Sequence, residues 1–276
     1  MESIPAFIEV AKSVQDNKGL IQQGWEALMT KLHGKKSTLI FTGLAGAGKT
    51  TLFDRLSGKT EQAGYKLAGR STKVEKSGKK LSADSVRDEP KKRLAYVVIP
   101  GQNSSIRQQA FEDLFKGSNE IAGVVHVVSA GLPILRERVA LQVLTEKGID
   151  TIEKFRQSQL EQELDDLDQT CKAIERYMTA SHKPIWMIVA LNKIDLFPET
   201  INQEISLYSK ASSQFNERLR ALQNRVGSLY FDWDIAPVSA WLEDFTYNNE
   251  KIDSTLRQPQ QQAYLKAFIE KIVERC

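Results

Sequence analysis

Short apolar runs alternate along this chain with longer stretches in which apolar residues recur at helical spacing. The runs that predict strands are Ser37–Thr42, Leu94–Ile99, Gly123–Val128, Pro184–Leu191 and Asp234–Val238. Most are apolar at nearly every position, which is typical of parallel strands covered by helices on both faces. The pattern therefore predicts an α/β fold with a mostly parallel central sheet and helices on both of its faces.

Helical spacing marks both ends of the chain. Residues 4–32 carry apolar positions at this spacing, with an interruption at Asn17–Gly19, and predict N-terminal helices. Residues 203–226 and 258–275 predict further amphipathic helices near the C-terminal end.

A long polar stretch from Arg136 to Met178 separates two of the predicted strands. Its many Glu, Gln and Asp residues favour a solvated helix that covers the sheet over a coiled coil that binds a partner. We expect an N-terminal helical extension at 1–36 and a larger domain at 37–276, with this long helical stretch at about 136–180.

A basic stretch runs from Lys66 to Arg93. It favours a solvated β-hairpin, in which Ser71–Glu75 pairs with Leu94–Val98, over a surface for an acidic partner or a membrane.

Composition excludes several classes of protein. The net charge of +3 is too small to indicate a nucleic-acid partner, and two cysteines exclude a disulfide framework and suit a reducing compartment. The sequence shows no secretory signal and no apolar run of transmembrane length. Glu2 and the terminal Cys276 do not fit lipidation motifs, so we expect no lipid anchor to support a membrane contact of the N-terminal helices. We expect a cytoplasmic protein.

Residues 43–50 read Gly-Leu-Ala-Gly-Ala-Gly-Lys-Thr, a complete G-x-x-x-x-G-K-[ST] phosphate-binding loop. Its glycines let backbone N–H groups turn toward a phosphate, its lysine reaches the β- and γ-phosphates, and its threonine hydroxyl coordinates Mg²⁺. A predicted strand precedes the loop and a helix follows it, so the positive end of the helix dipole faces the phosphate. The sequence predicts a nucleotide site that includes Gly43, Ala45, Gly46, Ala47, Gly48, Lys49, Thr50 and Thr51.

Two later motifs select the base. Asn192-Lys193-Ile194-Asp195 follows directly on an apolar strand, where the aspartate can accept from guanine N1–H and the exocyclic amine, donors that adenine does not offer as a pair. Asn192 is expected to brace the loop, and Lys193 to lie along the base. Ser239-Ala240 follows the last predicted strand, and the Ala240 N–H can donate to the guanine oxygen. The ordered motifs therefore predict guanine specificity.

With these motifs in order, the chain resembles the small GTPases of the translation-factor-related class, the Ras-like superfamily, and most of all its Arf-like branch. Pro100–Arg107 and Phe115 add to the resemblance, which spans roughly residues 37–275. The resemblance implies a P-loop NTPase G domain that binds GTP or GDP with Mg²⁺.

The resemblance also assigns roles to residues outside the phosphate loop. Gln102 matches the glutamine that orients the attacking water, and Gly101 matches the glycine whose N–H meets the γ-phosphate. Thr72 matches the threonine that binds Mg²⁺ in the first switch; Ser71 and an ordinary strand threonine are the alternatives. The segments 60–75 and 101–116 would then be nucleotide-dependent switches that contact a protein effector or regulator.

Two residues depart from the family pattern. The D-x-x-G motif reads Val98-Ile99-Pro100-Gly101, so a valine stands where an aspartate normally holds Mg²⁺ through water. Ala45 stands within the loop where fast-hydrolysing members carry glycine; its methyl group would crowd the glutamine, although Arf-like members tolerate other residues here. The valine lowers the Mg²⁺ affinity that we expect, and with it the rate of hydrolysis.

The leading hypothesis is a guanine-nucleotide switch that binds GTP and GDP with Mg²⁺ and hydrolyses GTP slowly. The alternative is a hydrolysis-deficient, GTP-binding scaffold or interaction module, which Val98 favours. An ATP-dependent kinase or motor has little support, because such an enzyme has no use for the motif from Asn192 to Asp195.

Overall fold

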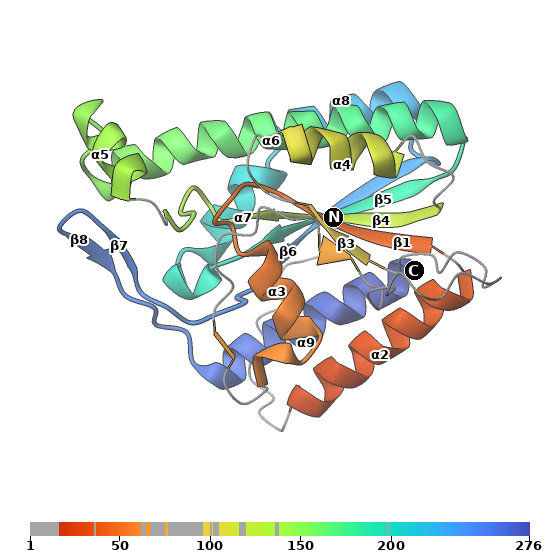
Figure 1. Ribbon diagram of the computed structural model, residues 1–276, viewed down its shortest axis with the longest axis horizontal. Coiled ribbons are helices and arrows are strands. Elements are labelled where there is room, and N and C mark those ends of the chain that lie inside the picture. Colours follow the sequence, from red (N-terminus) through yellow and green to blue (C-terminus); the bar gives the residue numbers. More distant parts are fainter. Residues whose placement is uncertain are drawn as a thin grey trace, which may run out of the picture.

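The computed structural model describes residues 17–35, 37–61, 65–66, 75–76, 96–99, 101, 105–115, 120–135, 138–197 and 199–276. A six-stranded sheet with the order β2-β3-β1-β4-β5-β6 forms the centre of the molecule (Figure 1). Its strands are β1 (Ser37–Thr42), β2 (Glu75–Lys76), β3 (Tyr96–Val98), β4 (Glu120–Val128), β5 (Ile185–Leu191) and β6 (Phe231–Pro237). All neighbouring pairs are parallel except β2 with β3. The predicted mostly parallel sheet is confirmed.

Alternate residues of the central strands point to opposite apolar layers. On β5, Met187 and Val189 belong to one buried cluster, whereas Ile188 and Ala190 belong to the other. Both faces of the strand are therefore covered, which explains why its sequence is a continuous apolar run.

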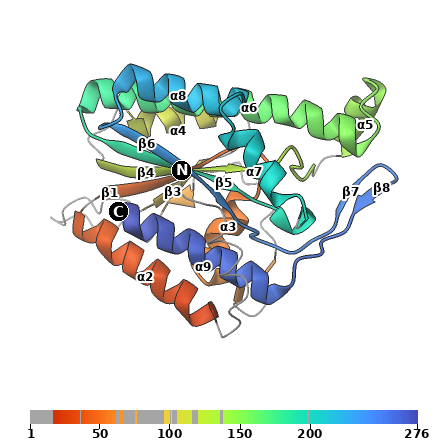
Figure 2. The same ribbon diagram turned by 180° about the vertical axis from the view of Figure 1, so that it is seen from behind.

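Helices cover the two faces in separate groups, as Figures 1 and 2 show. One face carries α4 (Ser105–Phe115), α6 (Ile152–Ser181) and α8 (Gln214–Val226), and the other carries α2 (Asn17–Lys35), α3 (Lys49–Leu56) and α9 (Gln258–Arg275). Shorter helices are α5 (Arg138–Glu146) and α7 (Ile201–Ser209), with single 3-10 turns η1 (Lys59–Glu61) and η2 (Ile194–Leu196). No described helix is long and apolar enough to cross a membrane.

Helix α2 packs along α9 and also touches α3 and β1. Its residues Leu28 and Leu32 are completely buried, in the same apolar cluster as Phe268 of α9. The predicted helix that begins near Ile4 lies outside the described residues. The described N-terminal helix is thus part of the layer that covers the sheet.

Two helical predictions need correction. The stretch at 136–180 is two helices, because Gly148 lies at φ 78° after α5 and Thr151 then caps α6, its side chain accepting from the Lys154 N–H at 3.3 Å. Similarly, 203–226 is interrupted after α7 by a turn in which the Ser213 N–H donates to the Lys210 carbonyl at 2.8 Å. Ser213 then occupies the N-cap of α8, a position that serine favours.

One element was not predicted at all. A two-stranded hairpin of β7 (Phe245–Tyr247) and β8 (Glu250–Ile252) follows the Ser239-Ala240 motif. It extends from the sheet toward α5 and the start of α6 (Figures 1 and 2). The hairpin pairing predicted from the basic stretch is seen in part: Glu75 pairs with Val98 and Lys76 with Val97, and Ser71–Val74 lie outside the described residues.

Candidate functional site

The phosphate loop joins the end of β1 to the start of α3. Gly43, Gly46 and Gly48 lie at φ 130°, 80° and 95°, backbone conformations that L side chains rarely adopt. A Cβ atom at Gly43 would overlap the Val127 carbonyl, and one at Gly48 would overlap the Asn192 side-chain amide. The loop therefore depends on its glycines both for backbone conformation and for close approach to its neighbours.

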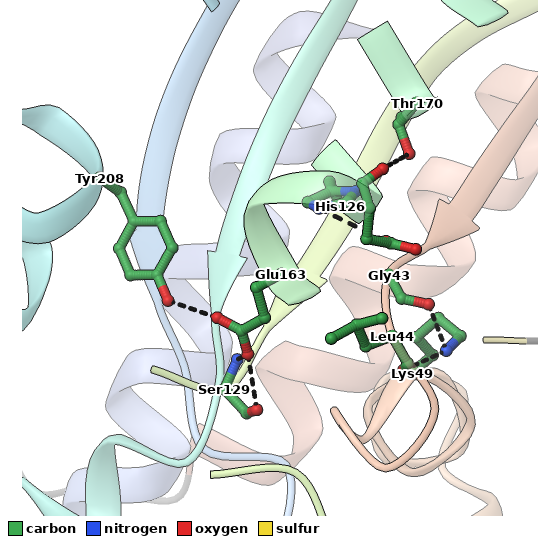
Figure 3. A network of polar contacts seen from close by, with 9 residues as sticks. Gly43, Leu44, Lys49, His126, Ser129, Glu163, Thr170 and Tyr208 are labelled. Carbon is green, nitrogen blue, oxygen red and sulfur yellow. Dashed lines mark hydrogen bonds and ion pairs between the residues drawn. The ribbon is translucent and has the colours of Figure 1, made fainter. Parts of the chain in front are cut away.

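Lys49 begins α3, and its buried side chain turns back across the loop. The Lys49 ammonium donates to the Gly43 carbonyl at 2.8 Å and to the Leu44 carbonyl at 2.7 Å (Figure 3). These bonds hold the positive charge against the rim of the loop, where the sequence predicts the phosphates.

Asn192 connects the phosphate loop to the base-side motifs. Its side-chain amide donates to the Ala47 carbonyl at 2.7 Å, and its oxygen accepts from the Ala240 N–H at 2.9 Å. The arrangement matches the predicted brace. The Ala240 N–H is used within the protein here, so its contact with a guanine oxygen stays a prediction.

Asp195 is almost completely buried, with 1% of its surface exposed. One carboxylate oxygen accepts from the Ser239 hydroxyl and the other from the Ser254 hydroxyl, both at 2.8 Å. The Glu243 N–H lies 3.4 Å from the second oxygen. The structure therefore joins the two predicted base-side motifs through Ser239, and it adds Ser254, a residue outside both motifs.

A cavity of about 380 Å³ opens beside these motifs. Residues of the phosphate loop, both base-side motifs and the hairpin surround it, together with Ile134, Leu135 and Leu141. The lining includes Gly46, Gly48, Asn192, Lys193, Asp195 and Ala240. The structure thus brings part of the predicted phosphate loop and the predicted base residues to one cavity.

Lys193 lies at φ 65°, and its ammonium donates to the Leu132 carbonyl. The same ammonium is 5.7 Å from the centre of the Phe245 ring. Lys193 thus lines the cavity with its ammonium bonded to the loop after β4 and close to the hairpin; that it lies along a base stays a prediction.

A buried carboxylate supports the loop that follows β4. Glu163 of α6 accepts from the Ser129 N–H and hydroxyl, both at 2.8 Å, and from the Tyr208 hydroxyl at 2.7 Å (Figure 3). Burial raises the pKa of Glu163, although these donors act in the opposite direction. Beyond this anchor, the Ile134 N–H of the same loop donates to the Gly46 carbonyl at 3.1 Å. Nothing in the polar run of α6 distinguishes Glu163 by sequence.

The metal side of the site lacks a carboxylate at the expected place. Val98 is 3% exposed and packs in the same apolar cluster as Phe41 and Phe53. The described residues contain no group of three His, Cys, Asp or Glu side chains that could hold a metal ion. Thr50 supplies a hydroxyl at the start of α3, so the protein residues fit Mg²⁺ only in part.

Gly101 lies directly against the phosphate loop. Its carbonyl accepts from the Ala45 N–H at 3.0 Å, and a Cβ atom here would overlap the loop backbone and the Lys49 ammonium. A glycine is therefore required at this position on steric grounds. Gln102 and Thr72 lie outside the described residues, and their roles stay predictions.

The parallel sheet, the phosphate loop at the end of β1 and the motif after β5 define a P-loop GTPase fold. Residues 34–140 match the family model described as the signal recognition particle receptor beta subunit. This match confirms the predicted resemblance to Ras-like small GTPases of the Arf-like branch; it covers less than half of the chain. No match was found among curated proteins.

Several solved structures are also similar to this chain. One is an ADP-ribosylation factor-like protein, the small COPII coat GTPase SAR1 of Encephalitozoon cuniculi with GDP, at 17% identity and TM-score 0.36, covering 98% of this chain and 96% of that one. Another is the signal recognition particle receptor SRb-GDP of Chaetomium thermophilum, at 11% identity and TM-score 0.41, covering 87% and 97%. A third is Toc33 of Arabidopsis thaliana with GDP and Mg²⁺, at 14% identity and TM-score 0.44, covering 92% and 91%. At these scores the neighbours carry no argument about individual residues.

Proposed function

We propose that this protein is a guanine-nucleotide-binding switch that binds GTP and GDP and hydrolyses GTP slowly. The observation that carries the proposal is the placement of Asp195, buried at the wall of the cavity that Asn192 links to the phosphate loop. The Asn192 side chain thereby links the phosphate end of the site to its base end.

The chemistry of Asp195 favours guanine. A carboxylate accepts hydrogen bonds only, and guanine offers N1–H and the exocyclic amine on one edge. Adenine would place a bare ring nitrogen against the same carboxylate, and a buried charge left without its donors costs binding energy.

The phosphate end supports binding more strongly than hydrolysis. The loop amides and Lys49 would hold the β-phosphate, and Thr50 would contact Mg²⁺, which neutralises phosphate charge when it is bound. Val98 cannot hold a metal-bound water, so we predict weaker Mg²⁺ binding than a carboxylate at this position would give. Gln102 is proposed to orient the attacking water.

Equilibrium binding tests the proposal directly. The full chain is titrated with GDP, GTP, ADP and ATP, alongside Asp195→Ala and the exposed-site control Asp232→Ala. Guanine nucleotides should bind at least about 100-fold more tightly than adenine nucleotides, because adenine cannot make the two hydrogen bonds that guanine donates to the carboxylate. Equal affinity for ATP and GTP would reject the guanine assignment.

The hydrolysis-deficient scaffold is the second candidate, and the burial of Val98 favours it. Single-turnover GTP cleavage separates the two candidates. An ordinary rate in the wild type that vanishes in Gln102→Ala would reject the scaffold, whereas no cleavage in either protein would support it.

Partners and location belong to this proposal as well. We propose a protein effector or regulator that contacts the segments 60–75 and 101–116, and a cytoplasmic location. No nucleic-acid partner is proposed, because the net charge is only +3.

A further inference from the structure

The hairpin segment, residues 242–255, supplies a side chain to the base end of the site. Ser254 lies 59 residues after Asp195 in the chain, yet its hydroxyl donates to one carboxylate oxygen at 2.8 Å. The Thr255 N–H also donates to the Asp195 carbonyl at 3.1 Å. The backbone and the side chain of Asp195 are thus both held by the end of this segment.

Ser254 is itself fixed. Its N–H donates to one oxygen of Asp244 at 2.9 Å, and the Lys251 ammonium lies 2.7 Å from the other oxygen of Asp244. These contacts join the two ends of the hairpin segment. The Ser254 hydroxyl is therefore presented to Asp195 from a closed loop.

The far end of the hairpin is anchored on α6. The ring of Tyr247 stacks on Phe155 with centroids 4.4 Å apart, and the Tyr247 hydroxyl donates to the Ile149 carbonyl. Glu250 accepts from the Ile152 N–H at 2.6 Å. Held at both ends, the hairpin segment forms one wall of the cavity, through its residues 243–248.

We propose that Ser254 is a positioning residue for guanine recognition, which orients Asp195 toward the two donors of the base. The terminal torsion of an aspartate is broad, so a carboxylate held by one hydroxyl can rotate away from a bidentate geometry. Hydroxyls on both oxygens restrict that rotation. The oxygen that accepts from Ser239 keeps lone-pair capacity for the base, and the oxygen that accepts from Ser254 receives only one further, long contact, from the Glu243 N–H at 3.4 Å. This inference rests on the proposed guanine binding and extends it to a residue outside the motifs.

The test compares GDP with inosine diphosphate, which lacks the exocyclic amine but keeps N1–H. Affinities of the full chain for GDP, inosine diphosphate and ADP are measured for the wild type, Ser254→Ala and Ser254→Thr. In Ser254→Ala the GDP affinity should fall about tenfold and the affinity for inosine diphosphate only about twofold, because the bidentate contact depends most on orientation. Ser254→Thr keeps a hydroxyl and should restore the wild-type ratio.

The matched control is Ser206→Ala, which removes an exposed hydroxyl that donates to the Asn202 carbonyl on α7. It should leave all three affinities unchanged. An equal loss for GDP and inosine diphosphate in Ser254→Ala would mean a structural role only and would overturn the inference. Tighter GDP binding would also overturn it, since Ser254 would then compete with the base. A wild type without preference for GDP over ADP would instead reject the proposed function itself.

Discussion

The base end and the metal end of the site differ in how completely the protein provides for its ligand. At the base end, Asp195 receives hydroxyls on both oxygens, and Asn192 bonds to the loops on either side. At the metal end, the position expected to carry a carboxylate is Val98, packed in the apolar core. The two ends therefore rest on different chemistry.

This difference separates recognition from catalysis. Base selection requires only oriented acceptors and donors, whereas phosphoryl transfer depends on charge stabilisation around the transferred group. A chain can therefore keep the first function in full while the second is slowed. We therefore predict that mutations at the base end change the preference for guanine nucleotides, whereas mutations at the metal end change the Mg²⁺ dependence of nucleotide affinity.

The largest effect is expected from Asp195→Asn. In this variant an amide N–H replaces a carboxylate oxygen and meets the guanine N1–H, so a donor faces a donor. The GDP affinity should therefore fall at least about 100-fold. Xanthosine diphosphate, which presents an oxygen in place of the amine, should bind the variant better than GDP does. Calorimetric titration checks both, with Asp232→Asn as the exposed control. A variant that keeps its GDP affinity would show that Asp195 does not recognise the base.

The next effect concerns the anchor behind the 129–134 loop. Glu163→Ala leaves the Ser129 and Tyr208 donors without an acceptor, so the free energy of unfolding should fall by about 2–4 kcal/mol. Urea unfolding measures this loss. Glu161→Ala, which changes an exposed residue of the same helix, should change stability by less than about 0.5 kcal/mol.

The same carboxyl group gives a pH dependence. Because burial raises the folded-state pKa of Glu163, the folded protein binds this proton more tightly than the unfolded chain does. Its contribution to stability is therefore full below the unfolded pKa and is lost as the pH rises through the raised folded value. Compared with Glu163→Gln, the wild type should lose stability from acidic toward neutral pH. A constant difference between the two proteins across that range would contradict the assignment.

Val98→Asp tests the metal end. A carboxylate here should strengthen the Mg²⁺ dependence of GDP affinity about tenfold, since it supplies the missing acceptor for metal-bound water. The buried site also predicts lower stability, so Val98→Asn serves as the control of similar size and polarity without the charge. If Asp and Asn variants show the same Mg²⁺ dependence, Val98 is not the reason for a weak metal site.

The smallest effect is expected at the hairpin anchor. Tyr247→Phe keeps the stack on Phe155 and removes the hydroxyl bond to the Ile149 carbonyl, so it should cost about 1 kcal/mol of stability. Amide hydrogen exchange should rise in residues 245–252 before it rises in β5. If hydrogen exchange in the hairpin does not change, the ring stack of residue 247 on Phe155 is sufficient to hold the hairpin in place.

The sequence predicted those parts of the molecule that local pattern determines. The strand around Ile188 and the loop from Gly43 are set by apolar continuity and by glycine conformation, and both are confirmed in place. The break before α8 had a signal, because Ser212 and Ser213 precede an apolar position and serine favours an N-cap.

The contacts that could not be predicted from the sequence join residues far apart in the chain. Ser254 meets Asp195 only because the hairpin returns to the cavity, and Glu163 is one acid among many until packing buries it. Neither residue stands in a motif or at a distinctive spacing. Their roles come from tertiary packing, which periodicity does not encode.

The most direct test of the whole account is GDP and ADP affinity measured with Mg²⁺ and again with the metal chelated. We predict at least about 100-fold preference for GDP in both conditions and less than about a tenfold loss of GDP affinity on chelation. Equal binding of ADP, or a loss of several orders of magnitude in GDP affinity without Mg²⁺, would contradict a site that is complete at the base and incomplete at the metal.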